Sequence, residues 1–597
     1  MPDSDAVNSC ASKIGGEDEG RLLKRTVFVT LALLVSGPVA AGEMESPIIT
    51  LSHVNWNAAT ASLTDHGTQP PAEAFGRLNA NTSKRFAGID KSTVPVLLPF
   101  DTETFRQDLA DGKAEATTSE KYFGAFHPTK FFLAGPAGYD ATFTLSNKED
   151  GLKIGFEKPI LFEISGAAFV YNLDPPNHVE KEEPIPKELD QQFPGIRRIL
   201  SEAYVRYVFE RFGVPYVLSI QCYDMRPSSR RLSCRQADPL AVRFLSLLRT
   251  AGGTPAKIQE PETDLSRPTT KSDFTFYGPG DLIENTGWKK MPGRVDYHVY
   301  ARMRYPIAYA PSYVKSQSFL PWGDCYRTGM AGRMGRKGAP YQCKVNGQPL
   351  VFDESAAVNF TYPWRDNFCE QRDFLVGQCP GGYGHQGEDI RPAQCVLNNA
   401  AADRCLPYQD LVAAVHDGVI RRLPGDLGVY IVVNTENEHV RFRYLHMNPK
   451  FMDTDGLLNG RQVSEGEIIG KVANWGDYDS GTSYHLHFNI QVFTKIGWVW
   501  VNPYMTLVAA YERLVGGRGT EIKAGEPAPA IPVKLPVILH PTPPAQAPAA
   551  SALPPATPGA SAAPPVKVVE AAAERTKPHK RHRIHRVRHK RRHKSDG

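Results

Sequence analysis

The 597-residue sequence has no apolar run of the roughly 20 residues that a membrane-spanning helix needs. We therefore expect no transmembrane span in the mature chain. The nine cysteines include no Cys-x-x-Cys spacing, which argues against a structural zinc cluster. Internal repeats are not evident. Hydrophobic residues make up 41% and charged residues 22%, as in ordinary globular proteins, and the length suffices for three or four domains of about 150 residues each.

A strong charge imbalance is also missing, except in one segment. The formal net charge is +5, but residues 575–597 carry eleven lysines or arginines against one aspartate, so the other residues sum to −5. We expect a tethered cationic arm that attracts anionic envelope polymers, although a merely solvated disordered tail fits the composition equally. The proline- and alanine-rich residues 516–574 should form an extended linker before it. No stacked-aromatic platform accompanies the arm, so sequence-specific nucleic-acid binding is not expected.

The N-terminus has the pattern of a signal peptide. Basic residues Arg21, Lys24 and Arg25 precede an apolar run over 27–35, and the small residues of 36–41 offer a cleavage site after Ala41. The alternative is an uncleaved anchor. Residues 1–41 are thus predicted to direct export, to the periplasm or beyond.

Cysteine spacing agrees with export. Without Cys10 in the leader, eight cysteines remain, and an even number in an exported chain suggests disulfides. The alternative, a zinc cluster, is disfavoured by the spacing. Judged by proximity alone, the expected pairs are Cys222 with Cys234, Cys325 with Cys343, Cys369 with Cys379, and Cys395 with Cys405.

Apolar patterns predict the regular structure. Short apolar runs bounded by turn residues indicate strands, and apolar residues at helical spacing indicate helices. Strict alternation of polar and apolar residues over 485–492 predicts a strand with one packed face and one wet or functional face. The expected elements are strands over 94–98, 131–134, 167–171, 217–220, 429–433, 440–444, 467–472 and 485–492, and helices over 200–212 and 240–248.

Four imidazoles and a carboxylate between residues 382 and 489 have the composition of a catalytic zinc site. His485 and His487 project from the same face of the predicted strand, because residues i and i+2 of a strand do so. Catalytic zinc takes three protein ligands and leaves a position for water. His385 and Asp389, in a glycine-rich turn, would supply two ligands, and His487 or His485 the third. The remaining two histidines, including His446, could move protons and stabilise an anionic intermediate.

These residues carry a family resemblance. Residues 358–512 resemble the lysostaphin-like zinc endopeptidases, which cut peptidoglycan cross-bridges. The matching motifs, in order, are His-x-x-x-Asp at His385–Asp389, an Ala-rich strand ending in Asp-Gly at 412–418, Tyr-x-His at Tyr444–His446, a Gly-bounded strand at 463–470, His-x-His at His485–His487, and Asn-Pro at 502–503.

The resemblance implies an exported zinc endopeptidase that hydrolyses peptide bonds in peptidoglycan stems or cross-bridges. It implies that Zn²⁺ is bound by His385, Asp389 and His487, and that His446 and His485 act as base and oxyanion stabiliser. Two alternatives stay open. One is a non-catalytic member of the fold that binds the wall or activates another hydrolase, and the other is a zinc protease acting on proteins.

The sequence departs from the family in two places. A segment with Cys395 and Cys405 is inserted after the first motif, and one with Cys369 and Cys379 replaces the usual Phe-Gly-x-Arg approach. Both should border the groove. His416 matches no functional position and is expected to be structural.

The predicted fold class is multidomain, with an all-β, antiparallel lysostaphin-like catalytic domain preceded by β-rich and α+β accessory regions and followed by a disordered tail. The expected segments are a signal peptide (1–41), a β-rich accessory domain (42–195), an α/β or α+β segment (196–253), a linker and disulfide-containing aromatic-rich region (254–350), a zinc metallopeptidase domain (351–515), a Pro/Ala-rich linker (516–574) and a basic tail (575–597).

Overall fold

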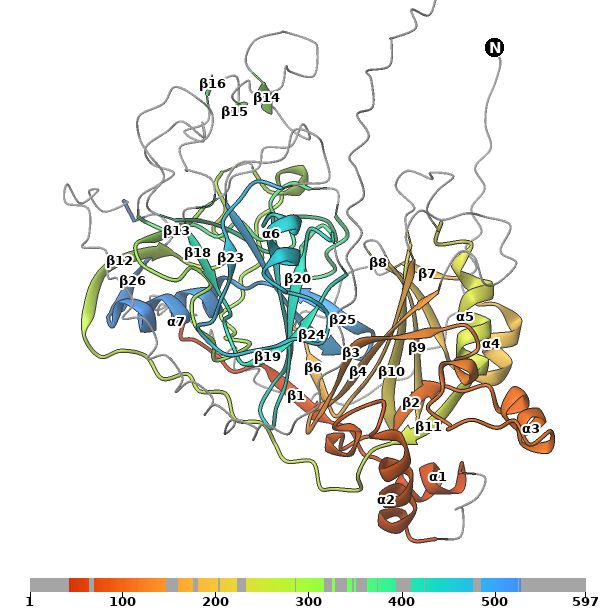
Figure 1. Cartoon of the computed structure of the whole chain (residues 1–597). Coiled ribbons are helices and arrows are strands. Elements are labelled where there is room, and N and C mark those ends of the chain that lie inside the picture. The colour runs from red at the N-terminus through yellow and green to blue at the C-terminus, as the bar shows by residue number, and fades with distance from the viewer. Residues whose placement is uncertain are drawn as a thin grey trace, which may run out of the picture. The chain divides into compact units, whose positions relative to one another are not determined.

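The computed structural model describes residues between 42 and 527 (Figure 1), and none of the helices described there is long and apolar enough to span a membrane. The predicted signal peptide, the basic tail, most of the Pro/Ala-rich linker and the Cys395–Cys405 pair lie outside the described residues. Gaps in the description fall at 64–68, 146–158, 175–180, 202–203, 223–231, 285, 316–324, 328–340, 346–347, 350–361, 373, 393–407, 409, 424, 476–484 and 524–525.

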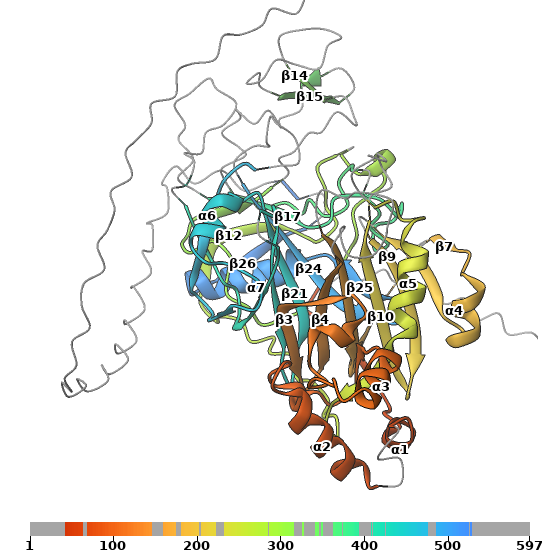
Figure 2. The ribbon, with the colours of Figure 1, turned by 45° about the vertical axis from the view of Figure 1, so that its right-hand side comes forward.

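A seven-stranded antiparallel sheet, here called the N-terminal sheet, forms the first large element. Helices α4 (Lys187–Gln192) and α5 (Ala237–Ser246) lie to one side of it in Figures 1 and 2. Phe244 of α5 stacks on Phe162, with ring centroids 5.6 Å apart, which anchors that helix on the sheet. In spatial order the strands are β3 (His127–Gly135), β4 (Gly138–Leu145), β5 (Ile160–Ala167), β10 (Val214–Gln221), β9 (Tyr204–Arg211), β8 (Arg197–Ser201) and β7 (Lys181–Glu183).

The helix predicted over 200–212 is wrong, because that segment forms β8 and β9. Residues 205–209 are buried on both faces of the sheet, so the segment lacks the alternation that marks a half-buried strand. In sequence, the turn after this segment resembles the end of a helix. Phe212 and Gly213 have φ of 57° and 73°, as in a two-residue hairpin turn, and a Cβ on Gly213 would lie 2.1 Å from the His53 carbonyl oxygen.

The boundary expected at residue 195 therefore falls inside one sheet, since β3 to β5 and β8 to β10 pair continuously. The strand predicted over 217–220 is confirmed as part of β10. The helix expected over 240–248 begins earlier, as α5, and β11 (Leu248–Gly252) starts before its predicted end.

The C-terminal sheet is an eight-stranded antiparallel sheet, and the strands predicted over 429–433, 440–444 and 485–492 are confirmed in it, with β24 beginning at Leu486. Helix α7 (Tyr504–Val515) supplies apolar side chains to the core behind the sheet. In spatial order the strands are β13 (Ser312–Val314), β17 (Glu388–Pro392), β24 (Leu486–Thr494), β21 (His439–Leu445), β20 (Val429–Asn434), β19 (Gly418–Arg421) and β22 (Gln462–Val463), with β25 (Gly497–Val501) paired to β24.

Smaller elements complete the fold. Strand β26 (Arg518–Ile522) pairs in parallel with β12 (Lys271–Tyr277), so regular structure continues past residue 516, where the linker was expected to begin. The region 254–350, expected to hold a linker and a disulfide-containing aromatic-rich part, contains strands β12 to β16. The remaining strands are β1 (Ile48–Leu51), β2 (Val96–Pro99), β6 (Phe169–Asn172), β12 (Lys271–Tyr277), β14 (Cys325–Arg327), β15 (Tyr341–Val345), β16 (Gln348–Pro349), β18 (Leu411–Ala413), β23 (Ile468–Lys471) and β26 (Arg518–Ile522). The remaining α-helices are α1 (Trp56–Ala61), α2 (Pro71–Thr82), α3 (Thr102–Ala110) and α6 (Pro449–Thr454).

Two of the expected disulfides are present, Cys222–Cys234 and Cys369–Cys379. For the third, the backbone register of β14 and β15 places positions 325 and 343 opposite each other. Disulfides are compatible with export, although they do not show it.

The two sheets pack face to face. Strand β25 lies against β10, and Trp498 and Phe493 share an apolar cluster with Val208 and Val217 of the N-terminal sheet. Figure 2 shows β4 and β10 beside β21 and β25. Every residue of β24 is buried. The polar face, expected to be wet or functional, is therefore not wet, and over the second half of the strand the N-terminal sheet covers it.

Candidate metal centre

Two paired strands set the positions of the central side chains. Asp389 on β17 lies opposite His487 on β24 in the antiparallel register, so both project from the same face of the C-terminal sheet, here called the site face. His385 lies in the turn before β17. Its backbone N–H donates to the Glu370 carbonyl at 2.7 Å, and its own carbonyl accepts from the Cys369 N–H at 3.0 Å. The loop closed by the Cys369–Cys379 disulfide thus holds the turn that carries His385.

Two positions of this turn require glycine because neighbouring backbone lies very close to them. A Cβ on Gly387 would lie 2.2 Å from the Phe488 carbonyl oxygen, and one on Gly384 would lie 2.6 Å from Cys369 Cα. A side chain at either position would push the turn away from β24 or from the disulfide loop. The glycines therefore allow His385 to approach His487.

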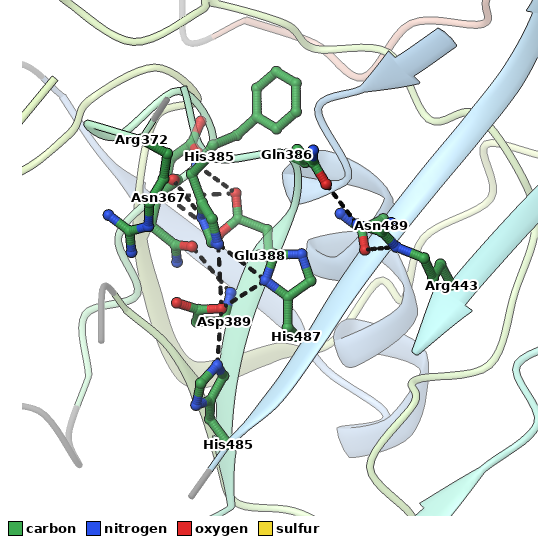
Figure 3. Close-up of polar contacts among 12 residues, drawn as sticks. Asn367, Arg372, His385, Gln386, Glu388, Asp389, Arg443, His485, His487 and Asn489 are labelled. Atoms are coloured by element: carbon green, nitrogen blue, oxygen red, sulfur yellow. Dashed lines mark hydrogen bonds and ion pairs between the residues drawn. The ribbon is translucent and has the colours of Figure 1, made fainter. Parts of the chain in front are cut away.

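Three ligand atoms converge within this frame (Figure 3). His385 Nε2 lies 2.9 Å from His487 Nδ1, His487 Nδ1 lies 3.0 Å from Asp389 Oδ1, and His385 Nε2 lies 3.3 Å from Asp389 Oδ1. Ligand atoms bound to a tetrahedral zinc at about 2.0–2.1 Å are roughly 3.3 Å apart. The spacing is therefore close to that of three ligands sharing one ion.

The chemistry of these atoms also fits a cation. His385 Nδ1 donates to the Asn367 carbonyl oxygen at 2.9 Å, so Nε2 presents a lone pair to His487 and Asp389. In the described part of the chain, Asp389 Oδ2 is buried and has no hydrogen-bond partner. A buried carboxylate that faces lone pairs is unfavourable without a positive charge between them. The residues present therefore fit a divalent metal ion.

Burial and neighbouring charge favour the metal-binding protonation states. Burial opposes ionisation of Asp389, but His385 and His485 outweigh it and hold the pKa of the carboxyl well below its usual value. Burial also holds the pKa of His487 well below its usual value. An ionised carboxylate and a neutral imidazole are the forms that bind metal ions.

His446 and His485 lie beside this triad. His485 Nε2 is 3.2 Å from Asp389 Oδ1, and the His446 and His485 rings are 4.6 Å apart. His446 has φ of 68°, and its Nδ1 donates to the Trp475 carbonyl oxygen, which leaves its Nε2 able to accept a proton. Burial and His485 lower the pKa of His446 to about 3.

The five predicted residues are thus brought together, and their individual roles stay a prediction. A second grouping, of His446, His485 and His487, could also hold an ion. His416 joins neither metal grouping found among the described residues. Its Nδ1 meets the Asp417 carbonyl oxygen and its Nε2 lies 3.4 Å from Glu438, which agrees with the structural role expected for it.

Sequence reasoning missed the residues that hold the site in place. Asn367 accepts from His385 through its carbonyl and from the Asp389 N–H through its side chain, at 2.9 Å each. Glu388, on the other face of β17, accepts from the Asn367 and Phe368 N–H groups. Burial and the adjacent Asp366 raise the pKa of Glu388 well above its usual value. The position of Glu388 within the first motif was its only signal in the sequence.

Comparisons with known proteins add little. No family model matches the chain, and no curated protein matches it. Among solved structures it is similar to the crystal structure of a candidate glycyl-glycine endopeptidase, lytM, from Ruminococcus gnavus ATCC 29149. That match has 21% sequence identity and a TM-score of 0.18, and it covers 24% of this chain and 53% of that one. The chain thus matches about half the length of that structure, and the likeness carries no argument about function.

Proposed function

We propose that this chain is an exported zinc-dependent endopeptidase that hydrolyses peptide bonds in peptidoglycan stems or cross-bridges. One observation carries the proposal. The ligand atoms of His385, Asp389 and His487 lie 2.9–3.3 Å from one another, with His446 and His485 alongside. The motif resemblance to lysostaphin-like endopeptidases supplies the substrate class.

The side chains have distinct tasks in this proposal. His385 Nε2, Asp389 Oδ1 and His487 Nδ1 would hold the ion. When bound, zinc would lower the pKa of a water toward about 7 and polarise the scissile carbonyl. This triad is preferred over the all-histidine grouping because its carboxylate offsets the ion's charge and its ligand atoms lie only 2.9–3.3 Å apart.

Proton transfer falls to the other two histidines. His446 is the general base, since Nδ1 donates to Trp475 and Nε2 is left to accept the proton of the attacking water. His485 donates a hydrogen bond to the anionic oxygen of the tetrahedral intermediate. His485 Nε2 lies 3.2 Å from Asp389 Oδ1, at the edge of the triad.

The test is hydrolysis of purified sacculi by the full chain and by matched histidine variants. His385→Ala should abolish both zinc retention and release of wall fragments, whereas His416→Ala should change neither. A chelator should abolish wild-type activity, and added zinc should restore it. Full activity in His385→Ala would overturn the proposal. Bound zinc without hydrolysis of sacculi, but with cleavage of casein, would identify a protease of proteins instead.

A further inference from the structure

An arginine on the site face lies next to the candidate metal centre and has no role in the proposal so far. Arg443 on β21 lies opposite Asn489 on β24, and the neighbouring row of the same face pairs Leu445 with His487. Arg443 therefore lies on the strand next to that of His487, a predicted zinc ligand, and two positions along from the residue opposite His487. Figure 3 shows it approaching from the side of β21.

The guanidinium is fixed by three neighbours. Nε donates to Asn489 Oδ1 at 2.9 Å, Nη2 donates to Gln386 Oε1 at 2.5 Å, and Cζ lies 4.2 Å from the centre of the Trp500 ring. Gln386 directly follows His385 in the chain. The position of Arg443 is thus tied to the same turn and strand that carry the metal ligands. These two bonds use two of the five N–H groups of the guanidinium.

The charge of Arg443 is not balanced within the described residues. Arg441, two positions earlier on the same face, stacks on Trp498 at 3.7 Å and forms ion pairs with Asp140 and Glu163. Arg443 also has an aromatic neighbour, but the two oxygens that accept its hydrogen bonds, from Asn489 and Gln386, belong to neutral amides. Within the part of the chain that the structure describes, no carboxylate lies within ion-pair distance of it.

Exposure distinguishes the two arginines further. Arg441 is 3% exposed, whereas Arg443 is only partly buried. A charge that is held rigidly, partly desolvated and left without a counter-ion is suited to bind an anion from solution. Its planar N–H groups match a carboxylate in two-point geometry.

We infer that Arg443 binds a carboxylate of the substrate, and that the centre acts on peptides carrying a free carboxylate near the scissile bond rather than on neutral polyglycine. This inference rests on the proposed function. The carboxylate could belong to a side chain or to a peptide C-terminus, and its chemistry is the same. Arg443 is then a specificity-determining residue that contributes to substrate binding rather than to the chemical step.

Two peptides that differ in one group test this inference. One carries a free carboxylate and the other a carboxamide at the same position, and both are labelled for fluorescence. The zinc-loaded full chain should favour the acid by about 10- to 100-fold in kcat/KM, mainly through KM, as expected for a charge-assisted hydrogen-bonded pair. Arg443→Gln should reduce this preference to about twofold or less while zinc content stays unchanged. Arg443→Lys should retain part of it.

A control variant completes the test. Arg461→Gln removes an exposed cation paired with Glu467, and it should leave the preference intact. Equal kcat/KM for acid and amide in the wild type would overturn the inference and leave the proposed function standing. If Arg443→Gln does not fold, Arg443→Lys decides, because an unchanged preference there contradicts the inference.

Failure of the proposed function would be recognised separately. If neither peptide is cleaved, equilibrium binding of the two peptides replaces kcat/KM as the readout. Tighter binding of the acid that is lost in Arg443→Gln would still support the anion site. Equal affinities would overturn it.

Discussion

Two clusters of buried ionisable side chains occupy the site face of the C-terminal sheet, and they differ in how charge is balanced. In the first, Arg421 and Arg441 face Glu163 and Asp140 of the N-terminal sheet. His439 Nε2 and Ser165 Oγ complete the hydrogen bonds of Asp140 at 3.0 and 2.6 Å. Burial opposes ionisation of Asp140, but Arg441 and His439 outweigh it and lower the pKa of the carboxyl. Opposite charges are paired within the fold.

The second cluster is the candidate metal centre, where one carboxylate faces four imidazoles. Among the described residues the buried Arg372 acts on Asp389 electrostatically, but no lysine or arginine forms a close ion pair with that carboxylate. The lone pairs on the ligand atoms of His385, Asp389 and His487 point toward one another rather than toward hydrogen-bond donors. The first cluster is complete without a ligand and joins two sheets, whereas the second needs a cation. The contrast separates buried charge that supports the fold from buried charge that supports function.

The largest expected effect on stability is at the inter-sheet cluster. Arg441→Met leaves Asp140 with one cationic partner fewer in a buried site, so the free energy of unfolding should fall by about 3–5 kcal/mol. Denaturant titration measures this. Arg461→Met, which breaks an exposed pair, should cost less than about 1 kcal/mol. A similar small loss in both variants would mean that the inter-sheet cluster does not hold the sheets together.

Zinc should stabilise the wild-type protein through the second cluster only. At about 1,000 times the Kd, zinc should raise the free energy of unfolding by about 4 kcal/mol, because the ion binds the folded state alone. Asp389→Asn should remove this gain, whereas Arg441→Met should keep it at lower overall stability. Thermal unfolding with and without zinc measures both. A zinc-dependent gain retained in Asp389→Asn would place the ion elsewhere.

A smaller effect is expected from the residue that orients the ligands. Asn367→Ala removes the acceptor of the Asp389 N–H but keeps the carbonyl that fixes His385. Zinc affinity should fall by about 10- to 100-fold, as for other groups that orient metal ligands. Competition with a chromophoric chelator measures this, with Asn459→Ala as a control, because the Asn459 side chain bonds to the Arg422 N–H and to no residue of the candidate metal centre. An unchanged Kd would show that Asp389 needs no such support.

The smallest effect is a pH dependence that separates the two clusters in metal-free protein. His446 has a pKa of about 3 when folded against about 6.5 unfolded, so the unfolded state binds the extra proton as pH falls below 6.5. Stability should therefore drop by about 2 kcal/mol at pH 5, and His446→Gln should reduce this drop. The folded state lowers the pKa of Asp140, so the stability that its ionised carboxylate contributes should be lost only below about pH 4. Unfolding titrations at pH 7, 5 and 3.5 would distinguish the two windows.

Local pattern was enough to predict the strand that carries His485 and His487. Every residue of this strand is buried, but Leu486, Phe488 and Ile490 share one face and polar side chains share the other, so the alternation survives. The motif spacings follow from strand geometry. The segment 204–211 failed the same method because apolar side chains occupy both of its faces, with Val205, Tyr207 and Phe209 on one and Val208 on the other, which breaks the alternation. Its second face is buried by Trp498, nearly 300 residues later in the chain, and no local window contains that information.

The long-range partners could not be predicted for the same reason. Asp140 and Glu163 look like polar residues of half-exposed strands until Arg441 is placed against them. Asn367 acts on His385 through a backbone carbonyl, which any residue type possesses. The unbalanced charge of Arg443 is visible only when the carboxylates around Arg441 are known. Residue types that do chemistry can be read from sequence, whereas the neighbours that balance or orient them depend on the fold.

Anomalous diffraction at the zinc absorption edge from crystals of the full chain grown with zinc tests the central claim most directly. The account predicts one peak at about 2.0–2.2 Å from His385 Nε2, an Asp389 carboxylate oxygen and His487 Nδ1, with His446 and His485 uncoordinated beside it. A peak bound by His446, His485 and His487 without Asp389, or no peak among these residues, would contradict it.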